Sequence, residues 1–368
     1  MATETARRRV RAEIDRLARA GLDNDGFRLA AADVLRTAVG FDWWCWTLLD
    51  PAADLPTRYL SNNPIIGGAQ RLFYRMLPAT AQPSPEWQST RPVTVLSAAT
   101  GGDLHRSRLW RDLLGPRGGG DQLVARLTAD GTAWAHLDLG REQASGWFTP
   151  DDADFLAGLA PLLAARLRAG LRTPRSRTEG DSAEDDSAAV TADEPGTIIL
   201  DRDLALVAAT GVAWRWIGRL GLQRPSDDEP LPGFVYAAVT RLAAAPDQPA
   251  ESITVRLQAT DGSWVVARVA PVTDSPRLDG GFVVTLEPAR VGDLAPLLMR
   301  AWGLSARERD VAALAIGGLP SQDIAAALFI SAHTVRDHLK SIFAKTGVNC
   351  RRDLAATLAG RATVPNSR

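Results

Sequence analysis

The clearest concentration of groups that could do chemistry lies in one short segment near the carboxyl end. Helical spacing puts Val335, Leu339, Ile342 and Phe343 on one apolar face. The opposite face and its flanks are basic and polar, with His333, Thr334, Arg336, Asp337, His338, Lys340, Ser341 and Ala344. Cations neutralise phosphates, and short polar side chains can reach base edges in a major groove. This face therefore predicts contacts with duplex DNA.

The residues that precede this face predict the helices that must position it. Ser305 and Glu308 have the spacing of a capping box, and the helix they start is expected to end at Gly317–Gly318. A short helix follows from Ser321, and Ser331 can cap the basic helix. Two short helices joined by a tight turn, the second with a basic face, describe a helix-turn-helix.

Residues 300–362 resemble the four-helix DNA-binding domain of the LuxR family. The residues that carry the resemblance are Leu304, Ser305, Arg307, Glu308, Gly318, Leu319, Ile324, Ala325, Leu328, Ser331, Thr334, Val335, His338, Leu339, Ile342, Lys345, Gly347, Val348 and Arg351. Three residues depart from the family pattern. Pro320 replaces a polar capping residue, Thr346 replaces a core leucine, and Cys350 replaces a capping serine.

The resemblance implies a transcriptional regulator whose helix from Thr334 to Lys345 enters the major groove. It implies Thr334, Val335, Arg336, Lys340 and Ser341 as DNA-facing residues, and it places His338 and Arg351 near phosphates. Ser331, His333 and Lys345 complete the interface predicted here. A homodimer on a two-fold DNA site is expected, because one helix-turn-helix alone contacts few bases. RNA polymerase is a further candidate partner.

The chain of 368 residues is long enough for two or three domains. Its formal net charge is only -1, but residues 300–368 carry ten basic and five acidic side chains, so the carboxyl end is locally basic. Residues 176–195 carry seven acids against one arginine, which predicts an acidic linker over residues 173–195. We therefore expect a multidomain protein with its nucleic-acid partner at one end.

The blocks on either side of the linker both predict α+β domains. In the first, residues 41–51 predict a strand, a hairpin turns at Asp130-Gly131, and Thr149 caps a long helix. This block, residues 1–172, is similar to GAF-type sensor domains. Residues 196–290 resemble a small PAS-like domain, with strands expected at 197–200, 204–207, 253–257, 264–269 and 282–286.

Seven of the eleven tryptophans fall between Trp43 and Trp147, enough aromatic surface to line a pocket for a small-molecule effector. The candidate ligand-binding residues are Trp43, Trp44, Trp46, Trp134 and His136. An alternative for these tryptophans is sheet core or a domain interface. His105 and His136 lack the further ligands that a haem or metal would need, so we expect no cofactor and no metal.

Several classes of protein are disfavoured. Phosphate-loop, nucleophile-elbow and zinc-protease motifs are absent from the sequence, so an enzyme is not expected. The first residues lack the apolar core of a signal peptide, and the apolar runs are too short to span a bilayer, which predicts a soluble cytoplasmic protein. The alternative to a regulator is a ligand-binding module whose helix-turn-helix mainly contacts other proteins.

Overall fold

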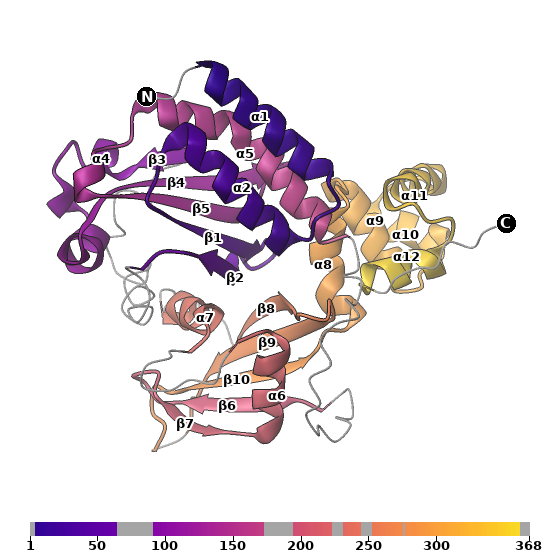
Figure 1. Ribbon diagram of the computed structural model, residues 1–368. Coiled ribbons are helices and arrows are strands. Elements are labelled where there is room, and N and C mark those ends of the chain that lie inside the picture. The colour runs from indigo at the N-terminus through magenta and orange to yellow at the C-terminus, as the bar shows by residue number, and fades with distance from the viewer. Residues whose placement is uncertain are drawn as a thin grey trace, which may run out of the picture.

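The computed structural model describes residues 4–64, 91–172, 194–222, 231–243, 252–274 and 277–360. These residues form two antiparallel five-stranded sheets with their own helices and a carboxyl-terminal group of helices, so the multidomain expectation is confirmed (Figure 1). Of the predicted linker, residues 173–193 lie outside the described residues. None of the helices in the described ranges has the length and apolar character to cross a bilayer.

The first sheet runs in the order β2-β1-β5-β4-β3. Its strands are β1 (Trp43–Asp50), β2 (Leu55–Ser61), β3 (Val93–Val95), β4 (Gly119–Ala129) and β5 (Thr132–Glu142). The predicted strand and hairpin are confirmed as β1 and as β4–β5. The helices α1 (Glu4–Arg19), α2 (Asn24–Val39) and α5 (Pro150–Gly170) cover one face, and the short α4 (Leu96–Ala99) follows β3 (Figure 1).

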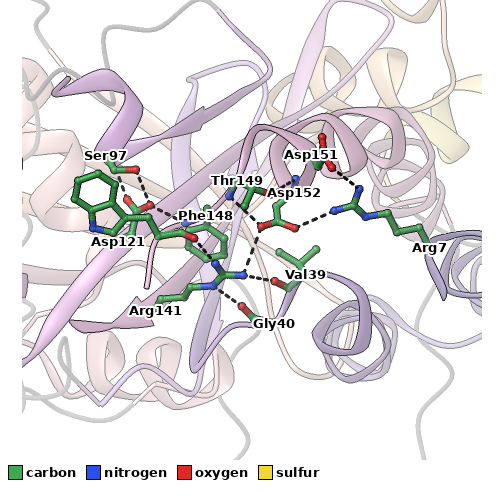
Figure 2. A network of polar contacts seen from close by, with 11 residues as sticks. Arg7, Val39, Gly40, Ser97, Asp121, Arg141, Phe148, Thr149, Asp151 and Asp152 are labelled. Carbon is green, nitrogen blue, oxygen red and sulfur yellow. Dashed lines mark hydrogen bonds and ion pairs between the residues drawn. The ribbon is translucent and has the colours of Figure 1, made fainter. Parts of the chain in front are cut away.

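The predicted cap of α5 is confirmed, and it also joins α5 to its neighbours. The Thr149 hydroxyl accepts a hydrogen bond from the Asp152 amide at 3.2 Å, and the Asp152 carboxylate accepts one from the Thr149 amide at 3.0 Å. Asp152 also binds Arg7 of α1 at 3.0 Å and Arg141 of β5 at 3.5 Å (Figure 2). One capping carboxylate therefore ties the start of α5 to α1 and to the sheet.

The second sheet, in the order β7-β6-β10-β9-β8, repeats the topology of the first. Its strands are β6 (Gly196–Leu200), β7 (Leu206–Ala209), β8 (Ile253–Gln258), β9 (Trp264–Pro271) and β10 (Phe282–Pro288), with α6 (Gly211–Arg219) and α7 (Gly233–Ala243) beside them. If the strands of each sheet are numbered 1 to 5 along the chain, both sheets have the spatial order 2-1-5-4-3. No repeat was expected from the sequence, so the two blocks share topology without sharing an evident sequence pattern.

A buried ion pair joins the two sheets. Asp50, at the end of β1, is fully buried, and its Oδ2 accepts from Arg256 of β8, from Nη1 at 2.9 Å and from the backbone amide at 3.0 Å. The Arg256 Nε in turn donates to the carbonyl of Asp293 in α8 (Val291–Ala301). Arg256 therefore contacts the first sheet and the first turn of the helix that leads into the carboxyl-terminal domain.

Asp50→Ala is expected to destabilise the protein by about 3 kcal/mol, because it leaves the largely covered guanidinium of Arg256 without its carboxylate. Denaturant unfolding followed by tryptophan fluorescence measures the effect. Asp33→Ala, which removes an exposed carboxylate from α2, is the matched control and should change stability by less than about 0.5 kcal/mol. Equal midpoints for the two variants would show that the buried pair contributes nothing at this junction.

The described part of the carboxyl-terminal region, up to residue 360, consists of α8, α9 (Ala306–Ile316), α10 (Ser321–Leu328), α11 (Ala332–Thr346) and α12 (Arg351–Leu358). The last four are the helices that the sequence predicts. The first, α8, was not anticipated as part of this unit, yet its Leu294, Leu297 and Leu298 belong to the same apolar core as Val335 and Leu354. The helical domain therefore begins before residue 300 and continues from β10 with only two residues between.

Candidate nucleic-acid interface

The two faces of α11 lie as their spacing predicts. Val335 and Ile342 are completely buried and Leu339 is 7% exposed, all in the core that α9, α10 and α12 share. The exposed residues of the helix on the opposite side are His333, Arg336, Asp337, Lys340 and Ala344. Burial of the apolar side fixes the rotation of the helix, so the polar side must point outward.

The turn before α11 holds its first residues in place. The Ser331 hydroxyl accepts from the Thr334 amide at 3.0 Å and lies 2.9 Å from the Thr334 hydroxyl. Phe329 ends α10 in the left-handed conformation, with φ of 55°, and its ring is 95% exposed. The amino-terminal end of α11 therefore presents two short hydroxyl side chains beside a tight turn, the arrangement that reaches into a groove in helix-turn-helix proteins.

Two cations on this face are free to bind an outside partner. Lys340 is exposed and makes no ion pair with any residue of the described ranges. Arg336 is exposed and donates from Nε only to the carbonyl of Ala332 in its own helix, at 3.3 Å. His333 lies 2.9 Å from Asp337, and both are exposed. A shallow hollow runs along the helix from Arg336 and Lys340 to the loop after it.

Ser341 and Lys345, both predicted to face DNA, are instead paired with Glu308 of the same domain, although Lys345 itself stays exposed. Glu308 Oε1 accepts from the Ser341 hydroxyl at 2.7 Å, and Oε2 accepts from Lys345 Nζ at 2.7 Å and from the Ser305 amide at 2.6 Å. Burial works to raise the pKa of Glu308, but these hydrogen bonds outweigh it and lower the pKa to about 2. The carboxylate is therefore ionised and joins the start of α9 to the last turns of α11.

Two other predicted DNA contacts also have inward positions. The expectation for Val335 is wrong in this structure, because its side chain is fully buried in the apolar core and cannot reach a base. Arg351 donates to the Leu319 carbonyl and, at 2.9 Å, to the Ser321 hydroxyl, so it holds the start of α10 against α12. His338 and Thr334 are half-buried at the flanks of the exposed face.

The three departures from the family pattern are accommodated locally. Pro320 occupies the cap position of α10 without a side-chain hydrogen bond. Thr346 is buried, and its hydroxyl donates to the Ile342 carbonyl at 2.8 Å, which satisfies its one donor. Cys350 caps α12 through its sulfur, which accepts from the Asp353 amide at 3.5 Å. None of the three changes which residues of α11 face outward.

The five predicted ligand-binding residues do not form one pocket. Trp44 and Trp46 lie in the core between the first sheet and its helices, so the alternative reading of sheet core holds for them. Trp43 and His136 lie at strand positions that face away from those helices, where Trp43 packs in a second core cluster with Leu109, Leu113 and Leu114. Trp134 lines a cavity of about 60 Å³ at the junction with the second sheet and α8.

The opposite face of the first sheet carries His136 together with three polar residues that the sequence analysis did not single out: Cys45, Thr47 and Asp138. Cross-strand pairing puts Cys45 opposite Asp138, and Thr47 opposite His136. Burial raises the pKa of Asp138 to about 7, and burial with the nearby Arg126 lowers the pKa of His136 to about 4. A row of polar groups on a sheet, with one buried carboxyl among half-buried neighbours, is unusual packing, and the alternation of β5 was the signal that could have found it.

Comparison with known proteins identifies the helical domain. Residues 303–358 match the family model "Bacterial regulatory proteins, luxR family". The carboxyl-terminal domain is a LuxR-type helix-turn-helix domain. A segment of 63 residues is 44% identical to the "Putative HTH-type transcriptional regulator Rv0890c" of Mycobacterium tuberculosis and, equally, to its counterpart in Mycobacterium bovis. The match covers 17% of this chain and only 7% of those relatives, so it concerns the LuxR-type domain and not the rest.

Solved structures resemble longer parts of the chain at low similarity. A free methionine-R-sulfoxide reductase of Neisseria meningitidis covers 46% of this chain and 94% of its own, at 21% identity and a TM-score of 0.30. The bacteriophytochrome RpBphP3 of R. palustris covers 78% of this chain and 63% of its own, at 14% identity and a TM-score of 0.31. A Vibrio cholera VqmA–ligand–DNA complex matches 46% of this chain and 85% of its own, at 20% identity and a TM-score of 0.23. Scores this low do not establish a common fold.

Proposed function

We propose that this chain is a transcriptional regulator that binds double-stranded DNA through the exposed face of α11. The observation that carries the proposal is the orientation of that helix. Its apolar side is buried in the LuxR-type domain, while Arg336 and Lys340 project outward without carboxylate partners in the described residues. Ser331 and Thr334 lie at the end of the helix that would enter the groove. Cations for phosphates and hydroxyls for base edges are therefore on one accessible surface.

The proposed interface is smaller than the one expected from the sequence. It comprises Ser331, His333, Thr334, Arg336, His338 and Lys340, with Ala344 at its far end. The side chains of Ser341, Lys345 and Arg351 instead bind other parts of the same domain. Only Arg336 and Lys340 are free cations on this helix, so two chains on a two-fold site would be needed for tight specific binding. We therefore include a homodimer in the proposal.

The two sheet domains are the proposed sensory half, the first GAF-like and the second PAS-like. Their shared strand order and the packing of α1, α2 and α5 on one face of the first sheet support this assignment. A small-molecule effector would bind the polar face of the first sheet around Asp138 and His136. Asp50, Arg256 and Asp293 give a continuous path of contacts from that sheet to α8.

Selection of bound fragments from genomic DNA, followed by footprinting, tests the proposal. We expect two protected half-sites whose centres lie about one helical turn, roughly 10 base pairs, apart or a multiple of it. Affinity for the selected site should fall steeply as salt rises, because phosphate contacts release counterions. Recovery of no preferred sequence and no salt dependence would favour the alternative, in which the helix-turn-helix contacts other proteins.

A further inference from the structure

The polar face of the first sheet contains a buried carboxyl group without a cation. Asp138 of β5 is 8% exposed, and its partner among the described residues is the Gln122 side chain of β4, whose Nε2 donates to Oδ1 at 3.3 Å. A carboxylate removed from water needs an opposite charge or several donors. Asp138 has neither among the described residues, so its ionised form is left without compensation there.

A second acceptor lies beside it. Gln122 is 3% exposed, and its Oε1 is buried without a hydrogen-bond partner among the described residues. Gln122 and Trp43 flank Gly140 from opposite sides, and the Trp43 ring lies so close to Gly140 that a Cβ there would come within 1.8 Å of it. The carboxamide therefore lies beside the carboxyl group of Asp138, and its Oε1 is a second acceptor there.

The other titratable groups around Asp138 do not supply the missing charge. Cys45, opposite it on β1, is neutral because burial raises the pKa of its thiol to about 12. His136, on the same strand, is neutral because its pKa is lowered to about 4. Arg126 of β4 is engaged by Asp54, whose two carboxylate oxygens lie 3.0 and 3.2 Å from its Nη2.

We propose that the effector of the first domain is a small organic cation whose protonated nitrogen binds between the carboxyl group of Asp138 and the Oε1 of Gln122. An ammonium or amidinium group has several N–H donors and a positive charge, so it satisfies both acceptors and offsets the desolvation of the carboxylate. An anion would face the carboxylate, and a neutral alcohol offers only one donor. This inference rests on the proposed function, in that it names the chemical class of the effector.

Ionisation of Asp138 then sets the pH dependence of binding. Its pKa in the folded chain is raised to about 7 from an ordinary value of 3.8, so it binds a proton in the pH range where the unfolded chain has already lost one. The cation binds the ionised form, and its affinity should rise about tenfold between pH 6 and pH 8 and then level off. Without ligand, Asp138→Asn should make the full chain more stable at pH 8, where the wild-type carboxylate is charged.

Three ligands of similar size but different charge form a charge series that tests the proposal: propylammonium, propanol and propionate. Each is titrated into the full chain, and binding is followed by ligand-observed NMR. Only propylammonium is expected to bind, and Asp138→Asn should weaken it at least about tenfold. Asp33→Asn, which removes an exposed carboxylate on the helical side, should leave it unchanged. Equal binding of propanol or propionate, unchanged binding by Asp138→Asn, or no binding of propylammonium would each overturn the proposal.

Measuring DNA binding by the wild type and by Asp138→Asn distinguishes failure of the cationic-effector proposal from failure of the proposed regulator function. Asp138→Asn without ligand should bind the selected DNA site, because the substitution is in the first sheet and far from α11 in the chain. Normal DNA binding together with failure of the charge series overturns the cationic effector alone. Absence of DNA binding by the wild-type chain overturns the regulator itself.

Discussion

Replacing both Arg336 and Lys340 with alanine is expected to weaken binding to duplex DNA at least about tenfold at physiological salt. The two side chains are the free cations on the outward face of α11 in the described structure, and each is expected to neutralise one phosphate. The slope of log affinity against log salt should become shallower by about 0.9 per lost contact, roughly four units for a dimer. Fluorescence anisotropy with a labelled duplex, titrated at several salt concentrations, measures both effects.

The matched control is Arg9→Ala/Arg202→Ala. It removes the same number of positive charges from exposed positions in the first and second domains. If binding depended only on the net charge of the chain, the control would weaken it as much as the Arg336/Lys340 variant. We expect the control to keep both the wild-type affinity and the wild-type slope, and circular dichroism should show that both variants fold. Equal losses would contradict a localised interface.

Glu308→Gln is expected to destabilise the LuxR-type domain by about 2–3 kcal/mol at neutral pH. The substitution removes the charge that binds Lys345, and it leaves the Ser305 amide or the Ser341 hydroxyl without a good acceptor. Thermal unfolding followed by circular dichroism measures the loss of helix. Asp310→Asn, at an exposed position of the same helix, is the control and should cost less than about 1 kcal/mol.

The effect of Glu308 should depend on pH in a fixed direction. Its pKa in the folded chain is about 2, below the ordinary value of 4.5, so its contribution to stability is fully present above pH 4.5. The contribution is lost as the pH falls from 4.5 towards 2, and the wild type and Glu308→Gln should converge there. If the difference in stability between the wild type and Glu308→Gln stays constant down to pH 2, the carboxylate charge is not what holds α9 to α11.

Local patterns predicted the parts of the site that depend on one element. Helical spacing separated the two faces of α11, and three-residue spacing predicted the caps at Ser305 and Thr149. Strand alternation could also have shown that Trp43 and its neighbour Trp44 point to opposite faces of β1. The prediction that the clustered tryptophans line one pocket did not take that alternation into account.

Sequence patterns did not predict the contacts between distant segments of the chain. By residue type and helical position, Ser341 and Lys345 are predicted DNA contacts. The structure shows that both instead bind Glu308, which lies more than thirty residues earlier in the chain. The polar row around Asp138 depends on the register of β5 against β1 and β4, which no single strand encodes. In the same way α8 became part of the helical domain only because its leucines reach the core of α12.

Photocrosslinking from Ala344 tests the central claim most directly. Ala344 is exposed on the outward face of α11, and it carries no charge that a probe would remove. With p-benzoylphenylalanine placed there, irradiation of the complex with its selected duplex should give a covalent protein–DNA product. The same probe at Arg9 should give none. Crosslinks from position 9 and none from position 344 would show that DNA is bound elsewhere on the chain.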